Sequence, residues 1–299
     1  MLNSFNEEAI LPFTLQNNIV RGRIGFLNQS INESIKYHNY PKNISYLIAQ
    51  SLMIMSLIGE TIKLKWKISL QIRSEGPIKL ICVDYFAPKE KNEKAKIRAY
   101  ASFKKNITKS KKDPFKMLEK GLMSISIDQG NGSKPYQGII NLSGNNISDS
   151  VCFFFLQSEQ LPTFFKIVLN SDIFENGNHC WNAFGIMVQY MPKNKGEIIN
   201  ENDYLHKVKT LINTLELSEM LYDRLSHEMI LNRLFHNENC IVFKKQEVAF
   251  GCTCNIKKVK EILKNFNNED IKNMTDEKKD IHVDCEFCGK RYSIKENDI

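Results

Sequence analysis

The chain has 299 residues, 42% of them hydrophobic and 25% charged, a composition that indicates a folded globular protein and excludes a disordered or fibrous chain. The formal net charge is +7, and residues 60–120 alone hold 17 Lys and Arg against 7 Asp and Glu. The first residues carry Glu7 and Glu8 and lack the pattern of a signal peptide, and the most apolar helical stretch, 44–58, is too short to cross a bilayer. We therefore expect a cytoplasmic protein with no membrane partner.

Two helices are predicted near the N-terminus, over 27–38 and 43–59. Apolar residues recur at helical spacing in the second helix, with Asn43 as its expected N-cap and Gly59 as its expected end.

Strands are predicted next. Strict alternation over 63–72 places Leu64 and Trp66 on the apolar face and lysines on the other, and 78–86 is the expected hairpin partner across the turn at 74–77. Further strands are predicted at 97–103, 122–127, 138–142, 163–169 and 184–190, and a short helix at 149–157. Strands at hairpin spacing with few helices between them predict an α+β domain of antiparallel sheets with packed helices, which we assign to residues 1–192.

The next part of the chain, 193–250, has a different pattern. Lys193-Asn194-Lys195-Gly196 has the composition of a linker, and short amphipathic helices are predicted at 205–217, 218–225 and 228–235. We expect a helical linker that packs on the first domain.

Four of the eight cysteines lie in the last 48 residues, as Cys252-Thr-Cys254 and Cys285-Glu-Phe-Cys288. Two close pairs of thiols are the pattern of a tetrahedral zinc site, and Gly289 suits the tight turn of a zinc knuckle. Residues 251–299 are too few to fold on a core alone, so we expect one Zn²⁺ per chain to stabilise this small α+β module. Asn255 is the expected cap of a helix that follows the first pair, and 290–294 the expected second strand of a hairpin.

The charge around this site is expected to be balanced by nearby basic residues, because four thiolates leave a zinc ion with a local charge of about −2. The candidates are Lys257, Lys258, Lys290 and Arg291. Each cysteine pair is also close enough in sequence for a local disulfide, and the Cys-x-Cys ring is small and strained, as labile disulfides are. Oxidation of either pair would remove two ligands, so the spacing predicts a redox switch.

The sequence resembles the heat-shock protein 33 family, which are redox-regulated holdase chaperones of bacteria. The resemblance rests on Phe250-Gly251-Cys252-Thr253-Cys254 and Cys285-Glu286-Phe287-Cys288-Gly289. It extends to four shorter matches in the expected order, Val20-Arg21-Gly22, Glu75-Gly76-Pro77, Tyr136-Gln137-Gly138 and Ser158-Glu159-Gln160-Leu161-Pro162-Thr163. Members of the family are often acidic, whereas this chain is basic.

The resemblance implies a chaperone that is not an enzyme. Its zinc ligands would be Cys252, Cys254, Cys285 and Cys288, and oxidation with zinc release would join Cys252 to Cys254 and Cys285 to Cys288. The module and the linker would then unfold, and the protein would bind unfolded or partly folded clients without ATP as a homodimer. The absence of a GxxxxGK[ST] motif from the sequence agrees with ATP independence.

The remaining candidates are interpreted as structural residues. His282, three residues before Cys285, is expected to be a strand residue rather than a ligand, and Cys180 and His179 are expected on opposite faces of a strand rather than as a catalytic pair. The isolated cysteines Cys82, Cys152 and Cys240 and the run Phe153-Phe154-Phe155 are expected in the core.

An alternative function follows from the basic interval 60–120, namely a nucleic-acid-binding protein with a permanent zinc ribbon. We favour the chaperone and expect no nucleic-acid partner, because many of these lysines alternate with apolar residues and would form the solvent-exposed face of a strand. Salt-sensitive binding of nucleic acid by the reduced protein is the observation that would favour the alternative.

Overall fold

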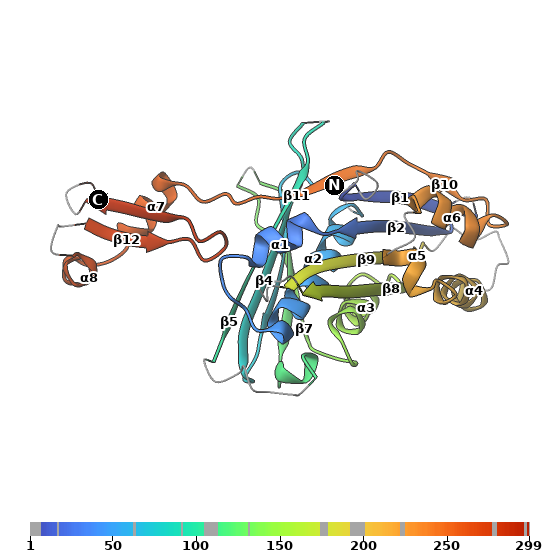
Figure 1. The fold of residues 1–299 in the computed structure, drawn as a ribbon, viewed down its shortest axis with the longest axis horizontal. Helices are drawn as coiled ribbons and strands as arrows, with labels where there is room; N and C mark the ends of the chain where they lie inside the picture. Colours follow the sequence, from blue (N-terminus) through green and yellow to red (C-terminus); the bar gives the residue numbers. More distant parts are fainter. Residues whose placement is uncertain are drawn as a thin grey trace.

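A computed structural model describes the protein over most of its length. It covers residues 7–16, 18–61, 64–90, 92–104, 113–130, 132–173, 179–191, 201–221, 225–276, 280–295 and 298. Within these ranges the chain forms an 11-stranded sheet with helices on both faces, and a small C-terminal module with a two-stranded sheet that projects from the main body (Figure 1).

The large sheet consists of two halves joined by one strand. The first half contains β3 (Lys67–Arg73), β4 (Ile78–Phe86), β5 (Ala95–Phe103), β6 (Leu122–Asp128) and β7 (Tyr136–Asn141). The second contains β1 (Ala9–Leu15), β2 (Val20–Leu27), β8 (Thr163–Ile173) and β9 (His179–Tyr190), with β10 (Ile241–Val242) paired to β1. The joining strand β11 (Gln246–Phe250) is parallel to β5 and antiparallel to β1, so the order is β7-β6-β3-β4-β5-β11-β1-β2-β9-β8.

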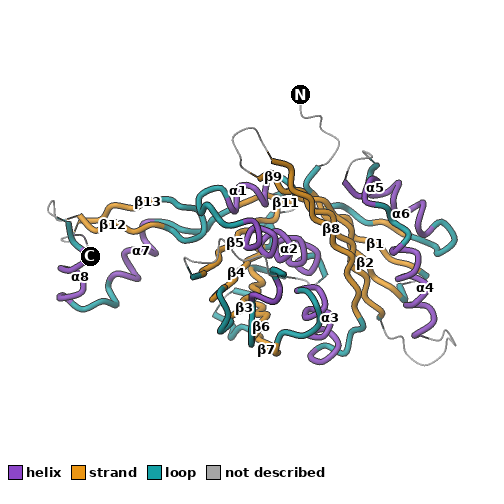
Figure 2. The backbone as a smooth tube through the Cα atoms, turned by 60° about the horizontal axis from the view of Figure 1, so that its bottom comes forward, coloured by secondary structure: helices purple, strands orange, loops and turns teal. Residues whose placement is uncertain are grey.

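The main core lies between the two halves of the sheet. Helix α2 (Lys42–Gly59) contacts strands of both halves and is buried on nearly every side, while α1 (Gln29–Ile35) and α3 (Ile147–Ser158) close the ends of this core (Figure 2). A single 3-10 turn, Phe115–Met117, covers the edge beside Gly76. The expected α+β architecture is confirmed.

The start of α2 differs from the prediction. Pro41, and not Asn43, is the N-cap, because its carbonyl accepts hydrogen bonds from the backbone N–H groups of Ile44 and Ser45 at 2.9 and 3.0 Å. The Asn43 side chain instead donates to Met117 Sδ at 3.7 Å. The helix does end at Gly59, as predicted.

The strand predicted at 63–72 is shorter than expected. It begins at Lys67, because the Lys65 N–H bonds to the side chain of Gln129 at 2.8 Å and not to a strand backbone, and Trp66 is 37% exposed. Residue 63 lies outside the described residues. The pairing of β3 with β4 is confirmed, with Leu70 opposite Val83.

The aromatic run on α3 is mostly core, as expected. Asn146 caps this helix by accepting from the Asp149 N–H, and Phe154 and Phe155 are buried, whereas Phe153 is exposed.

The second core lies on the opposite face of β1, β2, β8 and β9, beneath three helices of the segment that follows the first domain. These are α4 (Glu201–Asn213), α5 (Leu217–Leu221) and α6 (His227–Phe235). The residues with the composition of a linker, 193–196, lie outside the described residues. The segment 201–250 holds β10 and β11 in addition to the three helices, so it ends inside the large sheet.

The C-terminal module has its own small core. Helices α7 (Ile256–Leu263) and α8 (Asn268–Met274) pack on a hairpin of β12 (Asp280–Asp284) and β13 (Arg291–Lys295). Asn255 caps α7 by accepting from the Lys258 N–H at 3.0 Å, as predicted. Its buried apolar side chains are Val259, Leu263, Ile271, Ile281, Tyr292 and Ile294.

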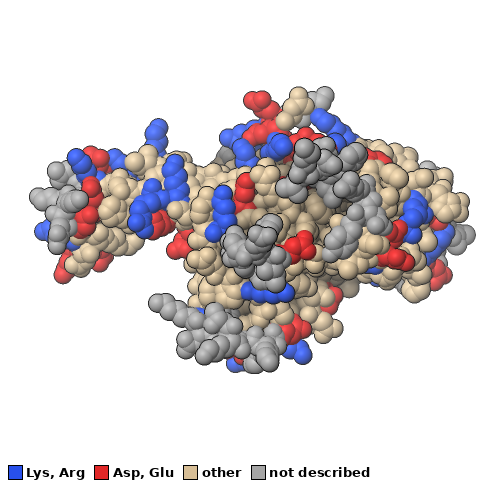
Figure 3. Space-filling model, viewed as in Figure 1, with Lys and Arg blue, Asp and Glu red and all other residues tan. Residues whose placement is uncertain are grey.

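Charges are mixed over the face shown in Figure 3, where basic and acidic side chains lie next to one another. Basic residues of the interval 60–120 form ion pairs with acidic neighbours, including Lys94 with Glu247 at 2.8 Å and Lys120 with Glu75 at 3.0 Å. Such pairing is typical of a solvated face. None of the described helices combines the length and the apolar character that crossing a bilayer requires.

Candidate metal centre

The four C-terminal cysteines converge on one point. The Sγ atoms of Cys252, Cys254, Cys285 and Cys288 all lie within 4.8 Å of one another, and each side chain is half-buried. Cys252 Sγ lies 3.7 Å from Cys285 Sγ, and Cys254 Sγ lies 3.4 Å from Cys288 Sγ. These separations are too long for a disulfide bond, so all four are thiols.

The arrangement fits a tetrahedral metal ion. Zinc–sulfur bonds of about 2.3 Å place neighbouring sulfurs of a tetrahedron about 3.8 Å apart, close to the distances observed here. Each ligand pair comes from a different end of the module, so one ion would cross-link the two ends.

The first pair is held by the strand that joins the two halves of the sheet. β11 ends at Phe250, and the Gly251 N–H bonds to the Ile97 carbonyl of β5 at 3.1 Å. A side chain at position 251 would collide with Lys96, since a Cβ there would lie 2.7 Å from it. Cys252 and Cys254 therefore lie just after β11, the strand that joins the two halves of the large sheet.

The second pair lies in the turn between β12 and β13, which we call the knuckle (residues 285–289). The Gly289 N–H bonds to the Cys285 carbonyl at 2.8 Å, and the Cys285 N–H to the Lys290 carbonyl at 3.0 Å. Gly289 has φ +65°, a conformation that favours glycine, and a Cβ there would also lie only 3.0 Å from Tyr37. Backbone N–H groups of Phe287 and Cys288 in this turn act to lower the pKa of the Cys285 thiol.

Two residues near the sulfurs were not identified from the sequence. Arg98 of β5 donates to Cys252 Sγ at 3.5 Å and to Thr253 Oγ1 at 3.2 Å, and the Tyr292 hydroxyl donates to Cys254 Sγ at 3.2 Å. Arg98 lies 154 positions before Cys252, so no local motif connects them. Tyr292 stands four residues after Cys288 on β13, where only the alternation of the strand could have pointed to it.

Three of the four basic residues predicted to balance the charge, Lys258, Lys290 and Arg291, take other partners. Lys258 Nζ donates to the Thr253 carbonyl at 3.0 Å, Arg291 pairs with Asp284 at 2.7 Å, and Lys290 lies over the Tyr292 ring. Among the described residues, the basic side chain that donates to a cluster sulfur is Arg98.

The sulfurs differ in acidity. Burial raises the pKa of Cys252, but hydrogen bonds from the Cys254 N–H and from Arg98 outweigh it and lower that pKa to about 7. Burial raises the pKa values of Cys285 and Cys288 above the usual thiol value, and the neighbouring Cys252 raises that of Cys285 further. Like charges this close disfavour one another, so a cation at the centre is what would stabilise all four thiolates together.

The other sulfur and imidazole candidates lie elsewhere. His282 is a strand residue, as expected, and bonds to Ser293 and Asp276. Cys180 lies within 3.6 Å of the side-chain amides of Asn28 and Asn32, and nothing is described of the His179 side chain. Cys152 and Cys240 pack at the edges of the two large cores, whereas Cys82 is partly buried on β4.

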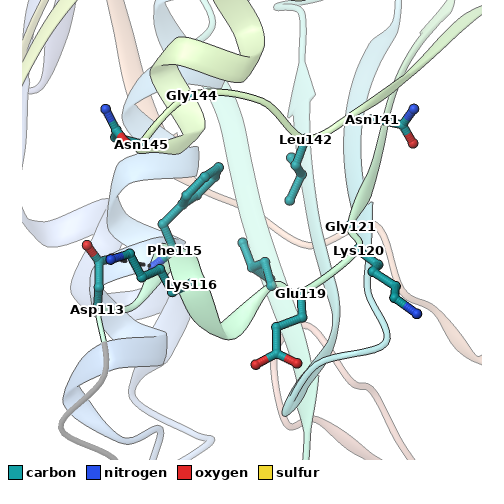
Figure 4. A pocket seen from close by; sticks show the side chains of 11 residues that line it. Asp113, Phe115, Lys116, Glu119, Lys120, Gly121, Asn141, Leu142, Gly144 and Asn145 are labelled. Carbon is teal, nitrogen blue, oxygen red and sulfur yellow. Dashed lines mark hydrogen bonds between the residues drawn. The ribbon is translucent and has the colours of Figure 1, made fainter.

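A separate depression of about 610 Å³ lies at the far edge of the first half-sheet, around Gly121 and Gly144 (Figure 4). Lys120, Asn141 and Glu119 point away from one another there, so its polar groups do not converge as the four sulfurs do.

Comparison with known proteins agrees with this geometry. The family model described as Hsp33 protein matches residues 8–295. The chain belongs to the Hsp33 family. It is 27% identical to the 33 kDa chaperonin of Proteus mirabilis, over 98% of this chain and 95% of that protein, and 30% identical to the 33 kDa chaperonin of Shewanella woodyi, with the same coverage.

A solved structure shares the fold. The crystal structure of the 33 kDa chaperonin (heat shock protein 33 homolog) of Thermotoga maritima matches with a TM-score of 0.79, covering 98% of this chain and 96% of that one at 20% identity. Membership of the Hsp33 family supports a chaperone function for this chain, and the four close cysteines can hold a metal ion.

Proposed function

We propose that this protein is a redox-regulated, ATP-independent holdase that keeps unfolding or oxidatively damaged proteins from aggregating. The observation that carries the proposal is the four-sulfur cluster, because it joins both ends of a module whose own core has six buried apolar side chains. A core of that size seldom stabilises a fold without a cross-link.

The reduced protein is proposed to hold one Zn²⁺ through Cys252, Cys254, Cys285 and Cys288. Zinc would keep all four sulfurs as thiolates and cross-link the module, which in small peptides is worth on the order of 10–16 kcal/mol. The domain limits proposed with it are a chaperone core of 1–192, a linker of 193–250 and the redox module of 251–299.

Oxidation acts on the sulfurs themselves. One thiolate attacks hydrogen peroxide and becomes a sulfenic acid with release of hydroxide, and the second thiol of the same pair displaces water to form a disulfide. Two disulfides are proposed, Cys252 with Cys254 and Cys285 with Cys288. Once the cluster opens, only the thiols of one pair stay close, because 30 residues separate Cys254 from Cys285.

Loss of the cluster is proposed to loosen the linker as well. Cys252 follows β11 directly, and β11 pairs with both β5 and β1. Helices α4 to α6 cover the apolar face of β1, β2, β8 and β9, so their release would expose that face to unfolded clients. The oxidised form is proposed to act as a homodimer in the cytoplasm and to need no enzymatic step.

The test is a peroxide titration of the zinc-loaded protein at elevated temperature. Released zinc, free thiols and aggregation of a heat-denatured client are measured on the same samples, with light scattering for the mass of the oxidised form. We expect close to one zinc per chain to be released, four thiols to be lost, and client aggregation to be suppressed only after that loss.

The matched control is Cys82→Ser, which removes a thiol outside the cluster and should respond as the unmodified protein does. Retention of zinc after the four thiols are lost, or client aggregation that is unchanged after its release, would refute the proposal. Peptide mapping that finds disulfides between the two pairs would refute the proposed pairing alone.

A further inference from the structure

The knuckle rests on an aromatic and cationic surface of the main body, which we call the seat. It consists of Phe86, Arg98 and Tyr100 on β4 and β5, with Tyr37 and His38 between α1 and α2. The contact is made by Phe287, whose side chain is not part of the module's own core. Phe287 therefore contributes to docking and not to the fold of the module that carries it.

Arg98 is the centre of the seat. Its guanidinium lies over the Phe287 ring, 3.9 Å from its centre, and over the Phe86 ring, 5.1 Å from its centre, so it makes cation–π contacts with both. Two bonds of 2.8 and 2.6 Å to the Asp84 carboxylate, which is 4% exposed, fix the plane of the guanidinium. These partners belong to the main body, so the seat keeps its shape without the knuckle.

The other residues of the seat contact Glu286 and Phe287, an acidic residue followed by an aromatic one. The Tyr100 ring meets Phe287 edge-on with 6.3 Å between ring centres, and the His38 ring meets Tyr100 edge-on with 6.0 Å between ring centres. Glu286 faces Tyr100 and His38: the pKa of Tyr100 is raised by burial and then by this carboxylate. An aromatic ring over an arginine is attracted to its charge, and the attraction is stronger where water is excluded.

The seat also has an open approach. A cleft of about 520 Å³ adjoins it, lined by Tyr37, His38, Asp284, Glu286 and Arg291 among others. An extended chain can therefore reach the seat along the surface, which a closed cavity would not allow.

Phe287 connects the cysteine cluster to the seat. Phe287 stands between Cys285 and Cys288, so any change that rearranges the knuckle moves its ring, whereas Arg98 and Tyr100 belong to a strand of the large sheet. We propose that the seat is a peptide-binding site that Glu286 and Phe287 occupy in the reduced protein, and that an acidic residue followed by phenylalanine in an unfolded client occupies it once the knuckle has left. This inference rests on the proposed function.

The test uses the full chain and a labelled peptide that copies residues 284–291 with serine at both cysteine positions. Phe287→Ala removes the ring from the seat but leaves every cysteine in place. Fluorescence anisotropy of the peptide is measured with reduced, zinc-loaded protein. We expect Phe287→Ala to bind it at least about tenfold more tightly than the unmodified protein, whose seat is occupied.

Two comparisons make the readout specific. A peptide with alanine in place of its phenylalanine should bind Phe287→Ala about tenfold more weakly, because the buried ring is lost. Adding Arg98→Lys should weaken binding about threefold, since lysine keeps the charge beside Asp84 but cannot stack as a plane. Equal binding by the two proteins, or by the two peptides, overturns the proposal.

A second measurement does not depend on the folding of a variant. The oxidised unmodified protein should bind the peptide, and the reduced one should not. If the oxidised protein suppresses client aggregation but does not bind the peptide, the seat is wrong and the proposed function stands. If Phe287→Ala binds the peptide but oxidation gives no client protection, the seat stands and the proposed function fails.

Discussion

Arg98 of β5 donates a hydrogen bond to Cys252 Sγ over 3.5 Å, although 154 positions separate the two residues in the sequence. The same guanidinium pairs with the buried Asp84 carboxylate. The sulfur cluster is therefore connected to an ion pair inside the main body. Arg98 contributes both to the stability of the sheet and to the docking of the module.

Replacing Arg98 separates these two roles. Arg98→Met removes the two closest charged donors from the buried Asp84 carboxylate, which keeps Ser69 at 2.5 Å and Lys67 at 3.9 Å as partners, and should cost the main body up to about 3–5 kcal/mol. Arg98→Met with Asp84→Leu should regain most of that loss, because no charge remains buried. In both proteins hydrogen exchange should rise over 251–254 and 285–289.

Urea titration and hydrogen exchange measure the two effects independently. Arg73→Met, an exposed arginine on β3, is the matched control and should change neither. Exchange at the knuckle that stays at the level of the unmodified protein in the double variant would contradict the role given to Arg98.

Lys166 of β8 fixes the end of α4 on the sheet. Its Nζ donates to the carbonyls of Ile212, Asn213 and Leu215 at 3.3, 3.3 and 3.0 Å, at the C-terminal end of the helix, where carbonyls lack the N–H partners of a continuing helix. Lys166→Met should destabilise the linker by about 1–2 kcal/mol and increase hydrogen exchange over 201–215.

The main body should keep its stability in that variant, because the aliphatic part of the side chain is retained. Lys134→Met, at an exposed position between β6 and β7, is the control. If both variants exchange alike over 201–215, Lys166 does not hold the linker.

Local patterns were enough to predict much of this fold. The alternation that ends in Leu70 and Ile72 gave β3 and its pairing with β4, and the two cysteine pairs gave the cluster, because each pattern is contained in a few neighbouring residues. Asn255 was identified as a helix cap for the same reason.

Other features depend on contacts that no local pattern encodes. β1 has the burial pattern of a strand covered on both faces, so Ala9–Leu15 shows no alternation and was missed. β11 is recognisable only through its partners, since Val248 pairs with Ala95 of β5 across the length of the domain. The contact of Arg98 with Cys252 follows from that pairing and could not have been found before it.

Removing one ligand should unfold the module without any oxidant. Cys288→Ser should lower zinc affinity at least about 100-fold and leave 251–295 accessible to protease. The loss in affinity should exceed that caused by removing a residue that only hydrogen-bonds to a metal ligand. Limited proteolysis and zinc content after dialysis are the measurements, with Cys82→Ser as control. A module that is equally resistant to protease in the two variants would show that the cluster does not stabilise it.

Acidification should loosen the linker through His227, the first residue of α6. Burial lowers the pKa of His227 to about 4. The charges of Glu228 and Glu7 act to raise this pKa, and that of Lys245 acts to lower it further. Because the folded state binds the proton more weakly than the unfolded state, whose pKa is about 6.5, the stability from a neutral His227 is complete above that pH and falls as the pH decreases toward 4.

The expected loss is about 2 kcal/mol at pH 5. Hydrogen exchange of α6, corrected for the intrinsic rate at each pH, should therefore increase between pH 7 and pH 5 in the unmodified protein. His227→Gln keeps the polarity but cannot gain the proton, so it should remove this increase while leaving intact any acid effect that originates at the cysteines. The carboxylates Glu228 and Glu238 cannot cause an increase between pH 7 and pH 5, because their pKa values are lowered below the usual 4.5. The same pH dependence in both proteins would place the acid-sensitive group elsewhere.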